Sequence, residues 1–384
     1  MQDFEGIRPY QDAEVAAVLK RLVSDEELNR AVCVLLLPRL ARWAPALARG
    51  LIRAYLTYRT RNLATVHDMQ LFLSGYMTRL IHETIHELSV DGLESLPTDA
   101  AYLFISNHRD IVMDSGLLNY VIHHAGHNTS RSAVGDNLLA EPYAADLMRL
   151  NKSFVVERSV TGNRAVYKML SRTSHYIRHS LEEGESVWIA QREGRSKDGF
   201  DRTEPALLKM LALAYRKDGD DIDELVRRVR IVPVAVSYEL DPCDLRKAHE
   251  LCVTEQFGSY TKPPDEDLHS IVEGMIGFKG RVHMHFAAPI HGQFEDADAL
   301  AREIDRLIVK GLKIFPTQVQ AAARLGMEKT STAPPIAEVE AAFEARLAKC
   351  PEAEQPYLLA NYANVFRNRE ELEPQPVLTN SAHD

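Results

Sequence analysis

Cysteines are few in this sequence, and their spacing fits neither a disulfide framework nor a zinc site. The four cysteines are Cys33, Cys243, Cys252 and Cys350, and no two of them form a CxxC pair. Small disulfide-stapled proteins and zinc-ribbon proteins are therefore excluded. The pattern favours reduced thiols, and we expect a cytoplasmic protein.

Long apolar runs are also absent. No run approaches the roughly 20 apolar residues that a helix needs to cross a bilayer. The N-terminal sequence MQDFEGIRPY is acidic and has no apolar centre, so it does not resemble a signal peptide. We therefore expect a protein that stays on the cytoplasmic side, either in solution or lying on the inner face of a membrane.

An excess of basic residues is absent from the chain as a whole. The formal net charge is −10 over 384 residues, with 26% charged and 45% hydrophobic residues, as in ordinary soluble domains. Since proteins that bind nucleic acid need a basic face, we expect no nucleic-acid partner.

One segment departs from this balance because it lacks acidic residues. Between Leu28 and His67 there is no Asp or Glu, and arginines alternate with Leu, Trp and Tyr at helical spacing. The arginines are Arg30, Arg39, Arg42, Arg49, Arg53, Arg59 and Arg61. Pro38 and Pro45 should divide the segment into short helices. A basic amphipathic arm over residues 28–61 suits an anionic membrane surface, or an acid-rich carrier protein. The alternative is a helical layer packed on the main domain, with its arginines in water.

Strands alternate with helices along the middle of the chain. Apolar runs at 101–105, 186–190 and 229–237 predict buried strands, and the pattern at 163–183 predicts a helix. This order indicates an α/β fold with a mixed, largely parallel sheet flanked by helices. The expected parts are an N-terminal helical arm (1–65), an α/β domain (66–315) and C-terminal helices with a disordered end after Glu373 (316–384).

The segment from Ser106 to Asp114 follows one of the predicted strands and carries His108, Asp110 and Asp114. In α/β folds the reactive groups usually lie where strands end. A histidine that is oriented by a carboxylate can deprotonate a hydroxyl group near neutral pH. The alternative is a helix start at which Asp110 accepts hydrogen bonds from the free amides and His108 is solvated.

The charged loop from Gln191 to Asp201 leaves a second predicted strand. Gly194 and Gly199 allow the backbone to approach a ligand closely, and Glu193 could pair with an arginine and hold it in place. The cations of the loop are Arg192, Arg195 and Lys197. Arginine suits phosphate because its planar fork makes two parallel hydrogen bonds. The loop therefore predicts an anion site, with a solvated turn as the alternative.

A short zinc-protease pattern competes with this interpretation. His82, Glu83 and His86 match HExxH, in which two histidines on one helical face hold zinc and the glutamate activates water. However, the predicted helix ends there, and no third histidine follows at the spacing of the metzincins. We therefore expect no metal site and keep the zinc protease as a distant alternative.

Taken in order, these motifs resemble the glycerophospholipid acyltransferase superfamily over about residues 85–315. The matching residues are Asn107, His108 and Asp114; Phe154 and Arg158; Glu193, Gly194, Arg195 and Ser196; and Val232, Pro233 and Val234. Two features depart from the family pattern. Five residues separate His108 from Asp114 instead of four, and Arg195 follows Gly194 directly instead of after one residue. The chain therefore resembles a divergent branch of the superfamily.

The resemblance implies roles for the residues that match. His108 would take the proton of an acceptor hydroxyl, and Asp114 would orient the imidazole, with Asp110 as the alternative. Arg158 and Arg195 would bind the acceptor phosphate, with Glu193 and Gly194 completing the substrate site.

The resemblance also implies an acyl transfer in phospholipid synthesis. The acyl donor would be a thioester of coenzyme A or of acyl carrier protein, and no further cofactor is expected. The preferred acceptor is 1-acylglycerol-3-phosphate, with glycerol-3-phosphate and a lyso-aminolipid as alternatives. A lipid-binding module without catalysis is the other class of function.

Overall fold

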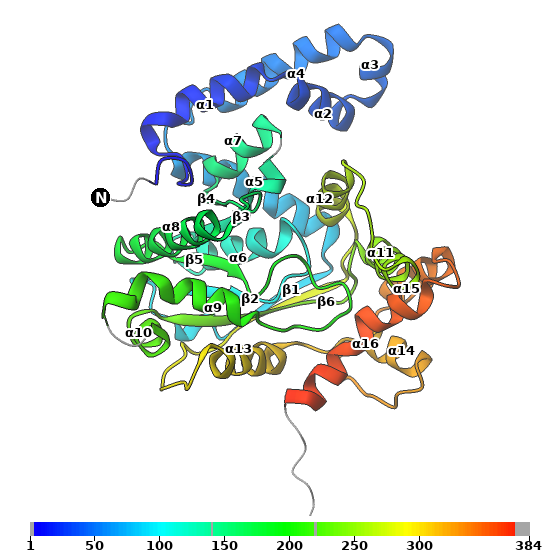
Figure 1. Ribbon diagram of the computed structural model, residues 1–384. Coiled ribbons are helices and arrows are strands. Elements are labelled where there is room, and N and C mark those ends of the chain that lie inside the picture. The colour runs from blue at the N-terminus through cyan, green and yellow to red at the C-terminus, as the bar shows by residue number, and fades with distance from the viewer. Residues whose placement is uncertain (1–3, 140, 219–220, 373–384) are drawn as a thin grey trace, which may run out of the picture. The chain divides into compact units, whose positions relative to one another are not determined.

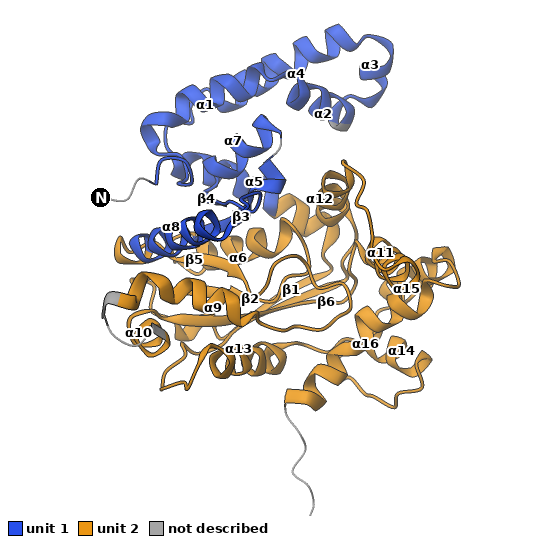
Figure 2. Cartoon of the chain, in the orientation of Figure 1, with its two compact units in different colours: residues 1–77, 130–180 blue, residues 78–129, 181–384 orange. Residues whose placement is uncertain are grey.

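The structure is a computed structural model that describes residues 4–139, 141–218 and 221–372 (Figure 1). The disordered end expected after Glu373 lies outside these residues. The chain forms two compact units, one of residues 1–77 and 130–180 (unit 1) and one of residues 78–129 and 181–384 (unit 2) (Figure 2). Among the described residues, no helix has the length and hydropathy that crossing a bilayer requires.

Within unit 2, five strands lie side by side in the order β1-β7-β6-β2-β5. The strands are β1 (Glu87–Asp91), β2 (Leu103–Ser106), β5 (Val187–Ala190), β6 (Ile231–Tyr238) and β7 (Arg281–Phe286). β2 pairs in parallel with both β5 and β6, and β7 is parallel to β1 but antiparallel to β6. The expected mixed, largely parallel sheet is therefore confirmed.

The central strands read as continuous apolar runs because helices cover both faces of the sheet. Every residue of β2 and of β6 is buried. Figure 1 shows α6 (Met113–His124) on one side of this sheet and α13 (Ala297–Gly311) on the other.

Pro233 lies inside β6, although a proline cannot donate to a strand ladder. Its carbonyl accepts a hydrogen bond from the Ala287 amide (3.0 Å), on the side of β7. The antiparallel ladder with β7 begins only at the next residue, Val234, which pairs with Phe286. The missing amide hydrogen of Pro233 therefore costs β6 none of its bonds to β2, and the strand stays central.

The rest of unit 2 is helical. Its helices beyond α6 and α13 are α9 (Pro205–Ala212), α10 (Asp221–Arg228), α11 (Asp244–Phe257), α12 (Glu266–Ile276), α14 (Pro316–Arg324), α15 (Ala337–Lys349) and α16 (Gln355–Leu372). Short 3₁₀ helices lie at Leu93–Ser95 and Leu213–Asp218. α16 packs on α11, α13 and α14, and Tyr362 and Ala363 of α16 are buried. The C-terminal helices expected from the sequence are present.

Unit 1 consists of helices and one pair of parallel strands, β3 (Arg131–Gly135) and β4 (Ser153–Val156). The helices within it are α1 (Asp12–Ser24), α2 (Glu26–Leu36), α3 (Pro38–Trp43), α4 (Pro45–Thr60) and α7 (Pro142–Leu150), with a 3₁₀ turn at Asp136–Leu139. The unit boundaries fall within α5 (Val66–Thr84) and α8 (Asn163–Glu182). Pro38 and Pro45 start α3 and α4, which confirms the two expected breaks.

Residues 130–180 join the N-terminal helices for a physical reason. Val15, Leu19 and Leu22 of α1 form one apolar core with Met69 and Leu150. The Val155 amide of β4 also donates to the Ile7 carbonyl (2.9 Å). The division of the chain therefore differs from the three consecutive parts expected from the sequence.

Asp305 of α13 makes the stability of the protein depend on pH. Its carboxylate accepts from the amide (2.7 Å) and hydroxyl (2.6 Å) of Thr203, and burial raises its pKa to about 6. The folded state therefore favours the protonated carboxyl. The stability that this contributes is complete below about pH 4 and is lost as the pH rises through 6, in total about 3 kcal/mol.

We predict that Asp305→Asn, which keeps an oxygen for Thr203, removes this loss. Relative to the parent, the variant should gain up to about 3 kcal/mol in unfolding free energy between pH 4 and pH 7. Urea unfolding across this range measures the difference. Asp298→Asn, at an exposed aspartate in the first turn of α13, is the control. A difference that is the same at every pH would contradict the prediction.

Candidate active site

Asn107 fixes the end of β2 to its neighbour β6. Its side-chain amide donates to the Val236 carbonyl (3.0 Å), and its side-chain oxygen accepts from the Val236 amide (2.8 Å). Asn107 is fully buried, so both groups need these partners. The residue that follows, His108, therefore leaves the sheet from a fixed point.

The carboxylate of Asp114 holds the ring of His108. Oδ2 lies 2.7 Å from His108 Nδ1 and also accepts from the amides of Arg109 (2.6 Å) and Asp110 (2.9 Å). Oδ1 accepts from the hydroxyl of Tyr238 (2.8 Å). Burial, and next the charge of Asp114, raise the pKa of Tyr238 well above its usual value, so this hydroxyl stays a donor. Both oxygens of the buried carboxylate are thus satisfied.

Because this contact uses Nδ1, the other ring nitrogen of His108, Nε2, is left to accept a proton. Because Nδ1 faces a carboxylate, the hydrogen-bond network assigns the proton to Nδ1 and a lone pair to Nε2. Nε2 has no hydrogen-bond partner among the residues that the structure describes, and the His108 side chain is 14% exposed. The ring meets Trp188 edge to face, with 5.8 Å between centroids. The geometry is that of a general base which one small group can reach.

Asp110, the other candidate for orienting His108, accepts hydrogen bonds from backbone amides instead. Its Oδ1 accepts from the amides of Val112 (3.0 Å) and Met113 (2.8 Å), at the start of α6. Burial, and next the Asp114 carboxylate, raise the pKa of Asp110. Asp110 therefore takes the helix-start position, and Asp114 is the carboxylate that contacts His108.

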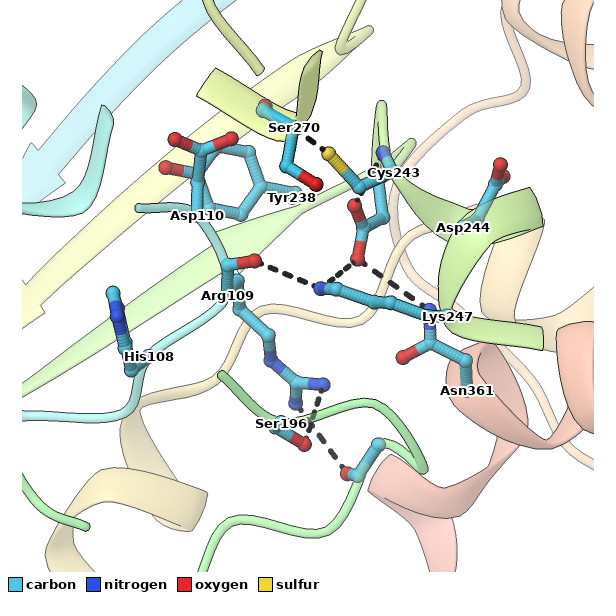
Figure 3. A network of polar contacts seen from close by, with 12 residues as sticks. His108, Arg109, Asp110, Ser196, Tyr238, Cys243, Asp244, Lys247, Ser270 and Asn361 are labelled. Carbon is cyan, nitrogen blue, oxygen red and sulfur yellow. Dashed lines mark hydrogen bonds and ion pairs between the residues drawn. The ribbon is translucent and has the colours of Figure 1, made fainter. Parts of the chain in front are cut away.

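Arg109 joins this motif to two other segments (Figure 3). Its guanidinium donates to the buried carboxylate of Asp201 (2.6 Å) and to the hydroxyl of Ser196 (3.3 Å). Its carbonyl accepts from the ammonium of Lys247 (2.8 Å), which is itself paired with Asp241. Arg109 therefore fixes the segment around His108, and its guanidinium binds other residues of the protein.

The loop of residues 191–201 lies directly beside His108. The Gln191 amide donates to the Ser106 carbonyl (2.8 Å), and the Ser196 amide donates to the His108 carbonyl (2.7 Å). Nη1 of Arg195 is buried and has no hydrogen-bond partner among the described residues. A buried guanidinium nitrogen without a partner is rare, and an anionic ligand would satisfy it. Gly194 has a positive φ of 73°, as its exposed turn requires.

Unit 2 thus brings together most of the residues that the sequence singles out. His108 and Asp114 are in contact, and the loop with Glu193, Gly194 and Arg195 is hydrogen-bonded to the His108 backbone. Arg158 belongs to unit 1, where it packs over the backbone of Gly135, and its role stays a prediction.

The zinc-protease alternative is wrong. α5 ends at Thr84, and the amide of His86 donates to the Gly280 carbonyl (2.7 Å) as the chain enters β1. His82 and His86 therefore do not share a helical face, and Glu83 pairs with Arg79 (2.7 Å). Over the described ranges, no group of three or more His, Cys, Asp or Glu side chains could hold a metal ion.

Two residues of the site, Tyr238 and Lys247, were not predicted from the sequence. Tyr238 reaches Asp114 from 124 positions along the chain, and Lys247 reaches Arg109 from 138. Tyr238 ends the strand that pairs with β2, but the sequence does not show which strands pair. For Lys247, a lysine in a polar stretch, no local pattern distinguishes a buried partner from a solvated side chain.

We predict that Gly274→Ala destabilises unit 2. A Cβ on Gly274 in α12 would lie 2.0 Å from Oδ2 of Asp110, whose other oxygen is held by two amides. Because the carboxylate cannot turn away, we expect a loss of about 1–3 kcal/mol in unfolding free energy. Gly75→Ala in α5 is the control, since its Cβ would meet nothing within 4 Å and alanine favours helix. Equal effects of the two substitutions would contradict the close contact.

The segment that contains His108 and the 191–201 loop is similar in sequence to known proteins. The family model for acyltransferases matches residues 87–237. A glycerol-3-phosphate acyltransferase of Alteromonas mediterranea is 33% identical over 157 residues, which are 41% of this chain and 17% of that protein. One from Pseudoalteromonas atlantica is 32% identical over 157 residues, 39% of this chain and 18% of that protein. The chain thus spans less than a fifth of the length of these relatives.

Among solved structures, the 1-acyl-sn-glycerophosphate acyltransferase of Thermotoga maritima aligns over 83% of this chain and 96% of its own. The sequence identity is 14% and the TM-score is 0.38. The matched segment, residues 87–237, contains β2, His108, Asp114 and the loop with Arg195. Residues 87–237 of this chain therefore match the acyltransferase family, in agreement with the resemblance of its motifs to the glycerophospholipid acyltransferase superfamily.

Proposed function

We propose that the chain moves a fatty acyl group from an acyl thioester to a hydroxyl of a glycerol-phosphate acceptor, in phospholipid synthesis. One observation carries the proposal. The Nδ1 atom of His108 is bound to Asp114 and its Nε2 atom is open, inside the segment that matches the acyltransferase family. The preferred acceptor is 1-acylglycerol-3-phosphate, with glycerol-3-phosphate and a lyso-aminolipid as alternatives. The donor is a thioester of coenzyme A or acyl carrier protein.

The reaction needs no nucleophile from the protein because the acceptor alcohol is one. Nε2 of His108 takes the hydroxyl proton while the oxygen attacks the thioester carbon. When the tetrahedral intermediate collapses, the carbon–sulfur bond breaks and the thiolate leaves. Nε2 returns the proton to the sulfur, so the products are an ester and a free thiol. Asp114 stabilises the imidazolium that forms in between.

Arg195 is the residue that we assign to the acceptor phosphate. Its unsatisfied nitrogen lies in the loop whose Ser196 amide is bound to the His108 carbonyl. The hydroxyls of a glycerol phosphate lie only a few bonds from its phosphate, so a phosphate held there would keep them near Nε2. Such positioning supplies a large part of catalysis. Glu193 and Gly194 would complete this binding site, and Arg158 remains a second candidate for the phosphate.

We further propose that the helices α2–α4 bind an anionic lipid surface on the cytoplasmic side of a membrane. Their apolar core within unit 1 is small, consisting of Cys33, Ala48 and Ile52 with partly buried neighbours. Many larger apolar side chains of these helices remain exposed: Val34, Leu36, Trp43, Leu47, Leu51, Tyr55 and Tyr58. The Trp43 side chain is 83% exposed, among arginines without any acidic residue from 28 to 67. This combination suits insertion between lipid headgroups.

We predict that His108→Asn abolishes most acyl transfer and leaves the fold intact. Asparagine can still donate to Asp114 but cannot take a proton, so the rate should fall by about 10²- to 10⁴-fold. The assay incubates the purified protein with an acyl thioester and labelled acceptors, and the lipid products are analysed. His291→Ala, at an exposed histidine of unit 2, is the control. A His108→Asn variant with nearly full activity would refute the mechanism.

We also predict that the arm binds vesicles through charge and through Trp43. The parent should bind vesicles that contain phosphatidylglycerol better than pure phosphatidylcholine, and less well as salt increases. Replacing Arg39 and Arg42 together by alanine should weaken this binding by about tenfold or more, at roughly 1 kcal/mol per arginine. Arg227→Ala, at a 70% exposed arginine of unit 2, should leave it unchanged. Equal binding to both kinds of vesicle would rule out the proposed surface.

A further inference from the structure

Three asparagines on one face of α16 are buried. Asn361, Asn364 and Asn368 have exposed fractions of 8%, 4% and 1%. Asparagine is a weak helix former, and its buried carboxamide costs free energy unless it is hydrogen-bonded. Apolar residues at these positions would favour the helix and its packing. The partners of the three side chains therefore indicate what the face is for.

Two of the asparagines bind consecutive carbonyls of the 191–201 loop. Asn364 Nδ2 donates to the Asp198 carbonyl (2.7 Å), and Asn368 Nδ2 donates to the Gly199 carbonyl (3.0 Å). The loop approaches the helix so closely that a Cβ at Gly199 would lie 2.3 Å from the Asn361 carbonyl oxygen. Gly199 also has a positive φ of 81°, which disfavours any other residue.

The same loop contacts the proposed active site at its other side. Its Ser196 amide donates to the His108 carbonyl, and the guanidinium of Arg109 reaches both Ser196 and Asp201. The Ser196 hydroxyl donates in turn to the Phe200 carbonyl (2.9 Å), next to the carbonyls that α16 binds. A continuous set of hydrogen bonds therefore leads from α16 through the loop to the segment of His108 and Arg195.

α16 also binds the segment behind Arg109. The Asn361 carboxamide contacts the Asp241 carboxylate (3.5 Å), and the Tyr362 hydroxyl accepts from the Asp241 amide (3.0 Å). Asp241 pairs with Lys247, whose ammonium also donates to the Arg109 carbonyl (Figure 3). One helix thus holds both segments that position Arg109.

We propose that α16 positions the acceptor-binding loop, and that Asn364 and Asn368 are positioning residues for the acceptor phosphate. This inference rests on the proposed function, because it concerns the loop that carries Arg195. α16 lies more than a hundred residues beyond the segment that matches the acyltransferase family. α16 therefore supports acceptor binding indirectly, through the loop, from outside the matched segment.

Acceptor kinetics test the proposal. Asn364→Ala and Asn368→Ala should each raise the KM for the acceptor by about three- to tenfold, as expected for the loss of one buried hydrogen bond. The KM for the acyl thioester should stay unchanged. Asn364→Asp should be worse than alanine, because it sets a carboxylate oxygen against the Asp198 carbonyl. The control is Glu370→Ala, at an exposed residue of the same helix that pairs with Lys329.

A double-mutant cycle with Arg195→Ala separates positioning from general stability. If the asparagines act through the loop, the effects of Asn364→Ala and Arg195→Ala on acceptor KM should not multiply, because the first acts on what the second removes. Multiplicative effects, or an unchanged acceptor KM in both asparagine variants, would overturn the proposal.

Hydrogen exchange tests the same contact without any activity. Peptides that contain Ser196 should exchange faster in Asn364→Ala and Asn368→Ala than in the parent, whereas peptides of β7 should not. Unchanged exchange at Ser196 would overturn the role of α16. A parent protein that transfers no acyl group to any acceptor would overturn the proposed function instead, and the exchange result would still decide on α16.

Discussion

The carboxylate of Asp114 is the interaction on which the arrangement of the site depends. It is fully buried and accepts hydrogen bonds from His108, from Tyr238 and from the amides of Arg109 and Asp110. A buried charge is tolerated only when hydrogen bonds replace its water. It also lies in the first turn of α6, where the helix dipole favours an anion. One charged group therefore fixes the turn after β2, the start of α6 and the imidazole ring together.

Arg109 extends this order outward because it is bound on every side. Its amide donates to Asp114, its carbonyl accepts from Lys247, and its guanidinium holds Asp201 and Ser196. The loop with Arg195 is therefore attached to the segment with His108 by backbone and side-chain bonds together. In the proposed reaction the base and the phosphate-binding group belong to one rigid assembly, which is what a positioned transfer requires.

The sequence predicted the elements and residues whose signals are local. The strand predicted at 186–190 and the helix predicted at 163–183 agree with β5 and α8 to within one residue, and His108 and Asp114 were found from their place after a buried strand. The contacts of Tyr238, Lys247 and Asn364 could not be predicted, because they join segments more than 100 residues apart and depend on strand order. The HExxH pattern could be set aside on a local signal too, because the predicted helix ends beside it, and α5 does end at Thr84.

Tyr238 lies just outside the segment that matches the acyltransferase family, although a buried residue of that segment depends on it. The family match ends at residue 237, one position before the tyrosine that binds Asp114. β7, which pairs with β6 in the middle of the sheet, also lies beyond the match, as does α16. A fragment cut at the family boundary would expose the edge of β6 and leave one oxygen of a buried carboxylate without its donor. The matched segment thus lacks partners that its own buried groups need, so a fragment made for expression or domain grafting has to extend beyond residue 237.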